Sequence, residues 1–310
     1  MAPGCLKVYS EHEVGIKDPV KERELPISVV IATLGGDVLK TTISNINQGD
    51  CVPSEILLCI PESEAAHADC VASVGNVFII KTSCRGQVAQ RAVGLGIAAY
   101  PYVMQLDDDV ILLQDTLNVL YKTLLAKGGG NVVAPFFRLH PAGQEGARYT
   151  KGFRGLLRNC HASLVLGAQF GIKRMGRISP AGIGFGVPLC SGAERFVESE
   201  WLPGGVALCH KADLITYNYY PFPGKAFSED LIHSILWRKQ GCRLWTVQDV
   251  SAMIDVTIES FAWKSVMHRY KAHAYVAGLC GGNVWRTRLW LAFYCLLNAR
   301  QLLAQNFFGK

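Results

Sequence analysis

"GQVAQRAVGLGIAAYPYVMQLDDDVIL", residues 86–112, joins three patterns that together indicate the fold. Its first part, residues 86–100, places Val88, Ala92, Leu95 and Ala99 on one helical face. The next run, residues 102–108, has the length and composition of a buried strand and runs into three consecutive aspartates, Asp107 to Asp109. The stretch therefore predicts a helix that leads into a central strand with a strongly acidic carboxyl end.

Three other apolar runs have the composition of buried strands: "PISVVIAT" at 26–33, "EILLCIP" at 55–61 and "NVFIIKT" at 76–82. Segments with helical spacing of apolar residues follow the first run and Asp115. Continuous apolar strands that alternate with helices predict an α/β fold with a mostly parallel sheet covered on both faces. Ligands bind such sheets at the carboxyl ends of the strands, which is where the aspartates lie.

Composition narrows the class of protein. Of the 310 residues, 50% are hydrophobic, 18% are charged and 31 are glycine, which suits a globular α/β enzyme and excludes a disordered or fibrous protein. The formal charge of +6 does not by itself indicate nucleic acid, and we expect no nucleic-acid partner. After Glu259 the chain has no Asp or Glu, whereas Lys and Arg recur up to Lys310. A basic, aromatic tail over 260–310 is typical of a segment that meets an anionic surface.

The cysteines and the hydropathy pattern indicate a compartment. Eleven cysteines, an odd number without a C-x-x-C pair, predict reduced thiols rather than a disulfide framework or a zinc site. Residues 1–24 form a polar leader without the apolar core of a signal peptide, and no run approaches the roughly 20 apolar residues of a membrane span. We expect a cytoplasmic protein. Its tail either lies as amphipathic helices on the cytoplasmic face of the inner membrane, or packs on the domain or on a second copy.

Carboxylates at a strand end have two explanations. A site for a divalent cation and a diphosphate needs one or two of them, because phosphate oxygens complete the coordination shell. If the strand extends to Asp109, alternation points Asp107 and Asp109 to one side and Asp108 to the other. Aspartate is also common in solvated turns, so the residues alone leave both explanations open.

Basic residues flank the start of the preceding helix. Arg85 and Arg91 lie beside Gly86, at a helix N-terminus of the kind that binds anions, and would suit a nucleotide diphosphate. Arginines on an ordinary helix surface explain the same pattern.

Two segments of the second half carry candidate chemistry. In "SEDL", Ser228 is a helix N-cap candidate. Glu229 and Asp230 have two explanations: the helix dipole stabilises carboxylates in the first turn, or one of them is a general base for an acceptor hydroxyl. In "WLPGG" (201–205), the glycines allow a ligand to approach the backbone, and the Trp201 indole can stack on a sugar or pack beside a turn.

In sequence order, "ISVVIAT", residues 86–112, "WLPGG" and "FSEDLIHSILWRKQGCRLW" resemble the inverting glycosyltransferases of family two, over about residues 25–255. The resemblance implies a single Rossmann-like domain of the glycosyltransferase A type with a helical C-terminal tail. It implies that Asp109 binds Mg or Mn and that Asp230 is the catalytic base. It also implies a donor site and an acceptor site: the donor residues are Thr33, Glu62, Arg85, Arg91, Asp107 and Asp108, and the acceptor residues are Trp201, Gly204, Gly205 and Glu229.

The sequence departs from the family pattern in two places. The second strand ends "CIPES" instead of in two carboxylate or amide residues, so only Glu62 is left to contact the base. The Q-x-x-R-W motif of processive members is replaced by "QGCRLW" (240–245), which has one residue too many. This favours the addition of a single sugar over polymerisation.

The resulting hypothesis is an inverting glycosyltransferase that uses a nucleoside-diphosphate sugar and a glycan or lipid-linked acceptor in surface polysaccharide or glycolipid synthesis. We divide the chain into a leader (1–24), a nucleotide-sugar-binding half (25–127), an acceptor-binding half (128–259) and the tail (260–310). A sugar nucleotidyltransferase is one alternative, although "TLGGDVLK" is a poor phosphate loop. A non-catalytic nucleotide-sugar-binding relative is the other.

Overall fold

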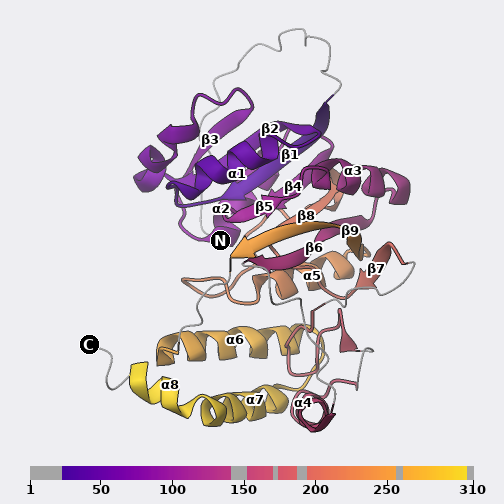
Figure 1. The fold of residues 1–310 in the computed structure, drawn as a ribbon. Helices are drawn as coiled ribbons and strands as arrows, with labels where there is room; N and C mark the ends of the chain where they lie inside the picture. The colour runs from indigo at the N-terminus through magenta and orange to yellow at the C-terminus, as the bar shows by residue number, and fades with distance from the viewer. Residues whose placement is uncertain (1–22, 141–151, 170–173, 187–193, 256–260, 306–310) are drawn as a thin grey trace.

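Parallel strands form the N-terminal half of a large sheet (Figure 1). The computed structural model describes residues 23–140, 152–169, 174–186, 194–255 and 261–305. Side by side in the order β3-β2-β1-β4, the parallel strands are β1 (Glu24–Ala32), β2 (Val52–Pro61), β3 (Val77–Thr82) and β4 (Tyr102–Leu106). Along β1, Val29 and Ile31 face one core cluster and Val30 faces another. Because both faces are covered, the strand is apolar throughout.

The second half of the chain extends the same sheet. β8 (Val206–His210) pairs antiparallel with β4 and with β6 (Asn131–His140). β6 pairs in parallel with β9 (Arg243–Asp255), which also holds β5 (Val110–Leu112) and β7 (Phe196–Ser199) antiparallel. The described strands therefore form one mixed sheet, in the order β3-β2-β1-β4-β8-β6-β9-β5 with β7 attached to β9.

Helices cover both faces of the sheet (Figure 1). α1 (Val38–Asn47), α3 (Thr116–Lys127) and the 3₁₀ segment η1 (Glu62–Val71) bury apolar residues in the cluster that contains Val29. α2 (Gln87–Ile97) and α5 (Glu229–Lys239) contribute to the clusters on the opposite face. A short 3₁₀ turn, η3 (Lys211–Asp213), follows β8. The sequence prediction of an α/β fold with strands near 26–33, 55–61, 76–82 and 102–108 is confirmed.

Two local expectations differ from the structure. β4 ends at Leu106, so Asp107 to Asp109 lie in the turn before β5, and the alternation expected along a strand does not apply to them. From the sequence no helix or strand is assigned to residues 138–200, where the chain forms α4 (Gly152–Leu164) as well as β7. Most of the predicted leader, residues 1–22, lies outside the described residues.

The C-terminal helices form a layer next to α5 (Figure 1). α6 (Trp263–Leu279) buries Val266, Ala272 and Val276, and packs on the segment that contains Gly182, where a Cβ would lie 2.0 Å from the carbonyl oxygen of His273. α7 (Val284–Leu297) runs beside α6 and is followed by α8 (Ala299–Leu303). This part of the tail packs on the domain. None of the helices described has both the length and the hydropathy needed to span a bilayer.

Candidate active site

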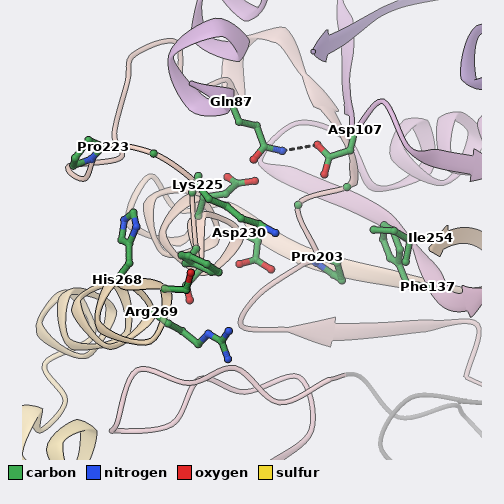
Figure 2. Close-up of a pocket in the computed structure, with 18 of the residues that line it drawn as sticks. Gln87, Asp107, Phe137, Pro203, Pro223, Lys225, Asp230, Ile254, His268 and Arg269 are labelled. Atoms are coloured by element: carbon green, nitrogen blue, oxygen red, sulfur yellow. Dashed lines mark hydrogen bonds between the residues drawn. The ribbon is translucent and has the colours of Figure 1, made fainter. Parts of the chain in front are cut away.

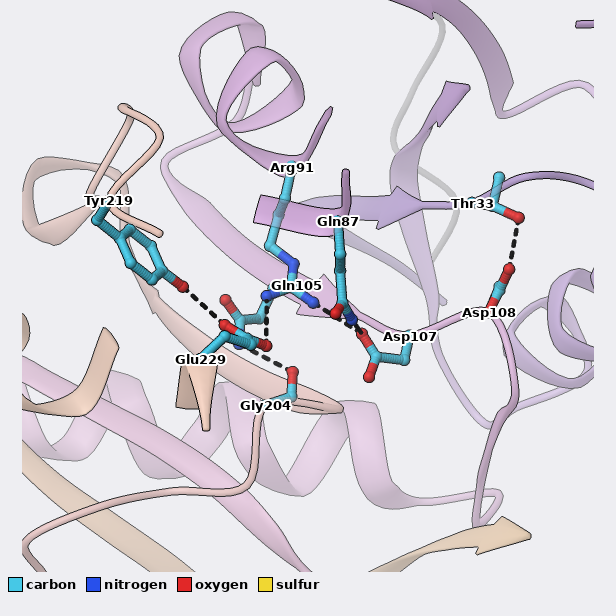
Figure 3. Close-up of polar contacts among 9 residues, drawn as sticks. All are labelled: Thr33, Gln87, Arg91, Gln105, Asp107, Asp108, Gly204, Tyr219 and Glu229. Carbon is cyan, nitrogen blue, oxygen red and sulfur yellow. Dashed lines mark hydrogen bonds and ion pairs between the residues drawn. The ribbon is translucent and has the colours of Figure 1, made fainter. Parts of the chain in front are cut away.

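A buried ionic network lies where β4, α2 and α5 meet (Figure 3). Arg91, on α2 and only 1% exposed, donates from Nη2 to Asp107 Oδ1 (2.7 Å) and from Nη1 to Glu229 Oε1 (3.0 Å). The Tyr219 hydroxyl donates to Glu229 Oε2 (2.8 Å), and the amide of Gln87 donates to Asp107 Oδ1 (2.9 Å). The network joins residues of both halves of the chain and holds two carboxylates in fixed positions.

Charges within the network shift one another's pKa values. Burial lowers the pKa of the Arg91 guanidinium, but the charges of Glu229 and Asp107 outweigh it and raise that pKa above its ordinary value. Burial raises the pKa of Asp107 to about 6, against the opposing effect of Arg91. Burial and the Glu229 carboxylate raise the pKa of the Tyr219 hydroxyl, which stays a hydrogen-bond donor.

Arg91 therefore has a different place from the one expected. Its guanidinium is covered and paired with two carboxylates, and Arg91 is not among the residues that line either cavity described below. From the sequence we expected Arg91 to meet a diphosphate directly. In the structure it positions Asp107 and Glu229 instead.

A cavity of about 510 Å³ opens at the carboxyl ends of β1 and β4. Thr33 and Asp108 line it and are hydrogen bonded to each other, while the Thr42 hydroxyl fixes the backbone carbonyl of Asp108 (2.6 Å). Arg85 and Lys225 also line this cavity. It thus combines a carboxylate and a hydroxyl with two cationic side chains, as a nucleotide diphosphate requires.

A larger cavity, of about 940 Å³, lies beside the first and contains Asp230 (Figure 2). Gln87 and the loop residues Gly224, Lys225 and Ala226 line both cavities, so they form a shared wall. Burial, and then the neighbouring Glu229 charge, raise the pKa of Asp230 to about 7, although the backbone N–H of Leu231 donates to Asp230 Oδ1 (2.9 Å). A carboxylate with such a pKa takes up and releases protons near neutral pH.

The start of α5 is held in an unusual conformation. Ser228 has a φ of 55°, in the left-handed region, and is the single non-glycine residue with positive φ among those the structure describes. Its hydroxyl contacts His273 Nδ1 (3.3 Å) and does not cap α5, contrary to the expectation that Ser228 is an N-cap. Strained residues of this kind cluster at functional sites. Here the strained residue immediately precedes Glu229 and Asp230.

The "WLPGG" segment contributes its glycines to the larger cavity. A Cβ on Gly204 would lie 2.5 Å from Glu229 Oε1, so only glycine fits against this carboxylate. The Gly204 carbonyl accepts from Gln105 Nε2 (2.9 Å), and Gly205 packs against Phe137.

Trp201 differs from its expected role as a platform for the acceptor. Its indole Nε1 donates to the Phe185 carbonyl (2.8 Å), and the ring packs beside Gly184 and Leu231. Trp201 is not among the described residues that line the larger cavity. It packs beside a turn, the alternative that the sequence left open.

Two glutamates follow β2 in the 3₁₀ segment η1, and neither lines the smaller cavity. Glu62 begins η1, is exposed, and is not among the described residues that line the smaller cavity. Glu64 instead accepts from Arg85 Nη1 (2.9 Å). This pair holds Arg85 at the cavity rim.

Known structures share this arrangement of strands and helices. No family model matches the sequence, and no curated protein matches it. The crystal structure of GalNAc-T7 with UDP, GalNAc and Mn²⁺ has a TM-score of 0.53 at 15% identity, over 75% of this chain and 43% of that one. The crystal structure of S. aureus TarS 1-349 in complex with UDP-GlcNAc has a TM-score of 0.51 at 13% identity, over 82% and 66%. The chain has the glycosyltransferase A-type fold. It spans less than two thirds of the length of either structure.

On the glycosyltransferase A-type fold, the acidic turn of this chain offers oxygen ligands of the kind that Mg²⁺ and Mn²⁺ prefer. Asp107 is held by Arg91 and Asp108 by Thr33, while Asp109 is half-buried and lines neither cavity. Within the described ranges no three His, Cys, Asp or Glu side chains converge as a metal site. The aspartates of this turn can supply part of the coordination shell of a cation, and the oxygens of a bound diphosphate would complete it.

Sequence reasoning missed several residues of these cavities. Lys225 follows Pro223 and Gly224 in a loop, a local signal that is too common to identify a site. Lys264, His268 and Arg269 on α6 line the larger cavity. Their signal was the basic C-terminal segment, whose position over the active site depends on tertiary packing.

Proposed function

We propose that the chain is an inverting glycosyltransferase that moves a single sugar from a nucleoside-diphosphate sugar to a hydroxyl of a glycan or lipid-linked acceptor. One observation carries the proposal. Asp230, a half-buried carboxylate whose pKa is raised to about 7, lies in a cavity that shares a wall with a second cavity lined by Thr33, Asp108 and Arg85. A transfer reaction needs such an arrangement, because its two substrates must be held side by side with their reacting atoms in contact.

The smaller cavity is proposed to hold the donor. Arg85 and Lys225 lie where they can neutralise a diphosphate, while the Thr33–Asp108 pair offers oxygen atoms to the hydroxyls of ribose or sugar. Because Lys225 lines both cavities, we place the diphosphate, the leaving group, at the shared wall.

Asp230 is proposed to act as the general base. Its carboxylate takes the proton of the acceptor hydroxyl while the hydroxyl oxygen bonds to the anomeric carbon from the face opposite the nucleotide. The bond between that carbon and the diphosphate breaks, and its electron pair leaves with the phosphate oxygen. Arg91 acts indirectly. It fixes the position of Glu229, and the charge of Glu229 helps to raise the pKa of Asp230.

Asp109, with Asp107 beside it, would hold Mg or Mn once a diphosphate is bound. The cation would supply positive charge to the leaving diphosphate. Arg85 and Lys225 provide the same kind of stabilisation from the chain's own residues.

The larger cavity is proposed to take the acceptor, with Gly204, Gly205 and Glu229 in its wall. Lys264 and Arg269 on α6 face the same space, which favours an acceptor that carries a phosphate beside its sugar. Lipid-linked saccharides have this chemistry. They would place the reaction in surface polysaccharide or glycolipid synthesis at the cytoplasmic face of the inner membrane, with the tail in peripheral contact.

A thermal-shift screen of nucleotide sugars, with and without Mn²⁺, tests the proposal. We expect one nucleotide class to raise the Tm, and the Mn²⁺-dependent part of the shift to disappear in Asp109→Ala. Asp230→Asn should retain the shift but lower transfer by at least about two orders of magnitude. NMR of the product should show inversion at the anomeric carbon.

Each alternative has its own outcome. Release of pyrophosphate from a nucleoside triphosphate would favour a sugar nucleotidyltransferase. Donor binding without turnover on any acceptor would favour a non-catalytic relative. Normal transfer by Asp230→Asn would refute the assignment of the base.

A further inference from the structure

One face of α7 is apolar and exposed. Trp285, Leu289, Phe293 and Leu296 recur every three to four residues, so they share one side of the helix. Trp285 is 68% exposed and Leu296 is 73% exposed. The opposite side of α7 faces α6, through the ring contacts of Trp290 with His273 and Tyr294 with Arg269. The helix is thus buried on one side and presents large apolar side chains on the other.

α4 extends this apolar surface, although it is about 130 residues away in the sequence and outside the tail. The rings of His161 and Phe293 are in edge contact at 5.6 Å, and Arg286 Nη1 donates to the Leu164 carbonyl (2.6 Å). The two helices lie together at the end of the molecule opposite the parallel strands (Figure 1). Leu156, Leu157 and Leu164 of α4 are all exposed, Leu164 by 74%. We call the exposed apolar residues of α4, α7 and α8 the apolar face: Leu156, Leu157, Leu164, Trp285, Leu289, Phe293, Leu296, Leu297 and Leu303.

The charge of these helices has one sign. α4, α7 and α8 contain arginines and no Asp or Glu: Arg154, Arg158, Arg286, Arg288 and Arg300. Large exposed apolar patches on a protein surface mark interaction sites. Helices that combine Trp, Phe and Leu with arginines are typical of the interface of an anionic bilayer.

We infer that the apolar face docks onto the surface of an anionic lipid bilayer, with α4 and α7 lying flat in its headgroup region. The charge argues against a second copy of the chain as the occupant. A symmetric dimer through this face would bring arginines against arginines, and none of the three helices supplies a carboxylate to pair with them. An anionic bilayer offers both apolar depth and the opposite charge.

The same face lies next to the larger cavity. α6 separates the two, because Lys264, His268 and Arg269 line the cavity while Arg269 and His273 also contact α7. A docked molecule would therefore bring the cavity close to lipid headgroups. That step rests on the proposed function, since it concerns a lipid-linked acceptor, whereas docking itself does not.

Co-sedimentation of the full chain with lipid vesicles tests the inference. We expect binding to vesicles that contain phosphatidylglycerol, weaker binding to pure phosphatidylcholine, and weakening by salt. Leu289→Ser with Phe293→Ser and Leu296→Ser should lower the partition coefficient at least about tenfold. Arg288→Gln with Arg300→Gln should lower it about fivefold for each arginine lost.

A matched control changes exposed apolar residues elsewhere. Phe78→Ser with Leu125→Ser, on β3 and α3, should leave vesicle binding unchanged. Circular dichroism and the nucleotide-dependent thermal shift show whether each variant is folded and binds donor, which separates loss of docking from failure of the proposed function. Absence of vesicle binding by the folded wild-type chain would overturn the inference. So would a wild-type dimer that becomes monomeric when the α7 side chains are changed.

Discussion

Arg91 and Glu229 are 138 residues apart in the sequence, yet Nη1 of one lies 3.0 Å from Oε1 of the other, and both side chains are buried. The pair ties α2 to α5, and through Asp107 it ties both helices to the acidic turn. The proposed base follows Glu229 directly, so its position depends on an ion pair whose arginine lines neither cavity.

Arg91→Met should destabilise the protein by about 3–5 kcal/mol, because it leaves the buried Glu229 and the partly buried Asp107 without their counter-charge. Urea denaturation measures the change. The matched variant Arg85→Met breaks the more exposed pair with Glu64 and should cost less than about 1 kcal/mol. Equal losses for the two arginines would contradict the buried network. In Arg91→Lys, which keeps the charge, we expect kcat to fall more than the donor KM rises.

The pH profile should report the ionisation of Asp230. Since its pKa is raised to about 7 by burial and by Glu229, Asp230 of the folded chain is protonated below neutral pH and cannot then act as the proposed base. We expect kcat/KM to rise about tenfold per pH unit up to about pH 7 and then to level off. A profile that is flat between pH 5 and 8 would exclude Asp230 as the base.

The same ionisation should affect stability. A carboxyl whose folded pKa is raised binds its proton more tightly in the native state, so stability falls as pH rises from the ordinary carboxyl range to about 7. Asp230→Asn removes the buried charge and should raise the Tm at pH 8 by more than about 2 °C, with a smaller effect at pH 5. Asp37→Asn, at an exposed position, should show no such pH-dependent difference.

Lys225 and Lys264 should have separable kinetic effects. Lys225→Ala removes the cation that lines both cavities and should raise the donor KM about tenfold or more, as for a charge-assisted hydrogen bond. Lys264 lines the larger cavity and not the smaller one, so Lys264→Ala should raise the acceptor KM with little effect on the donor KM. Steady-state kinetics with each substrate varied in turn distinguishes the two, and a donor defect in Lys264→Ala would reverse our placement of the substrates.

Gly204→Ala should damage the active site more than its size suggests. The new Cβ would lie 2.5 Å from Glu229 Oε1 and displace that carboxylate from Arg91. We expect loss of activity together with a lower Tm. Gly96→Ala is the control, because open space surrounds its Cβ on α2 and the helix should gain about 0.5–1 kcal/mol. Similar activity in both variants would show that the contact at Gly204 is dispensable.

Much of the fold could be predicted because its signals are local. An apolar run such as 26–33 and the helical spacing in 86–100 can be recognised within a short stretch of sequence. The structure forms β1 from the first and α2 from the second, as expected. α4 was missed because its two glycines and scattered arginines resemble a loop, and its leucines face outward instead of marking a buried side.

The candidate site was less predictable, because roles there depend on contacts between distant segments. Asp230 could be proposed from its motif, and it does line a cavity. Arg91 looked like a surface arginine at a helix start, and only the approach of Glu229 from α5 reveals it as buried. Lys225 has no local signature, since its position between two cavities is a property of the folded loop.

The strand order has a consequence for how the chain acquires its structure during synthesis. β5, from the first half, pairs with β9, and β4 pairs with β8, so strands made early wait for partners made some 100 residues later or more. Such long-range pairing slows folding, because the loop entropy must be lost before the contacts form. A nascent chain that ends before residue 229 would have the acidic turn without its partners from α5 and β9. Assembly of the proposed active site should therefore be among the last events of folding, and a truncated chain should be a substrate for proteases rather than a partly active enzyme.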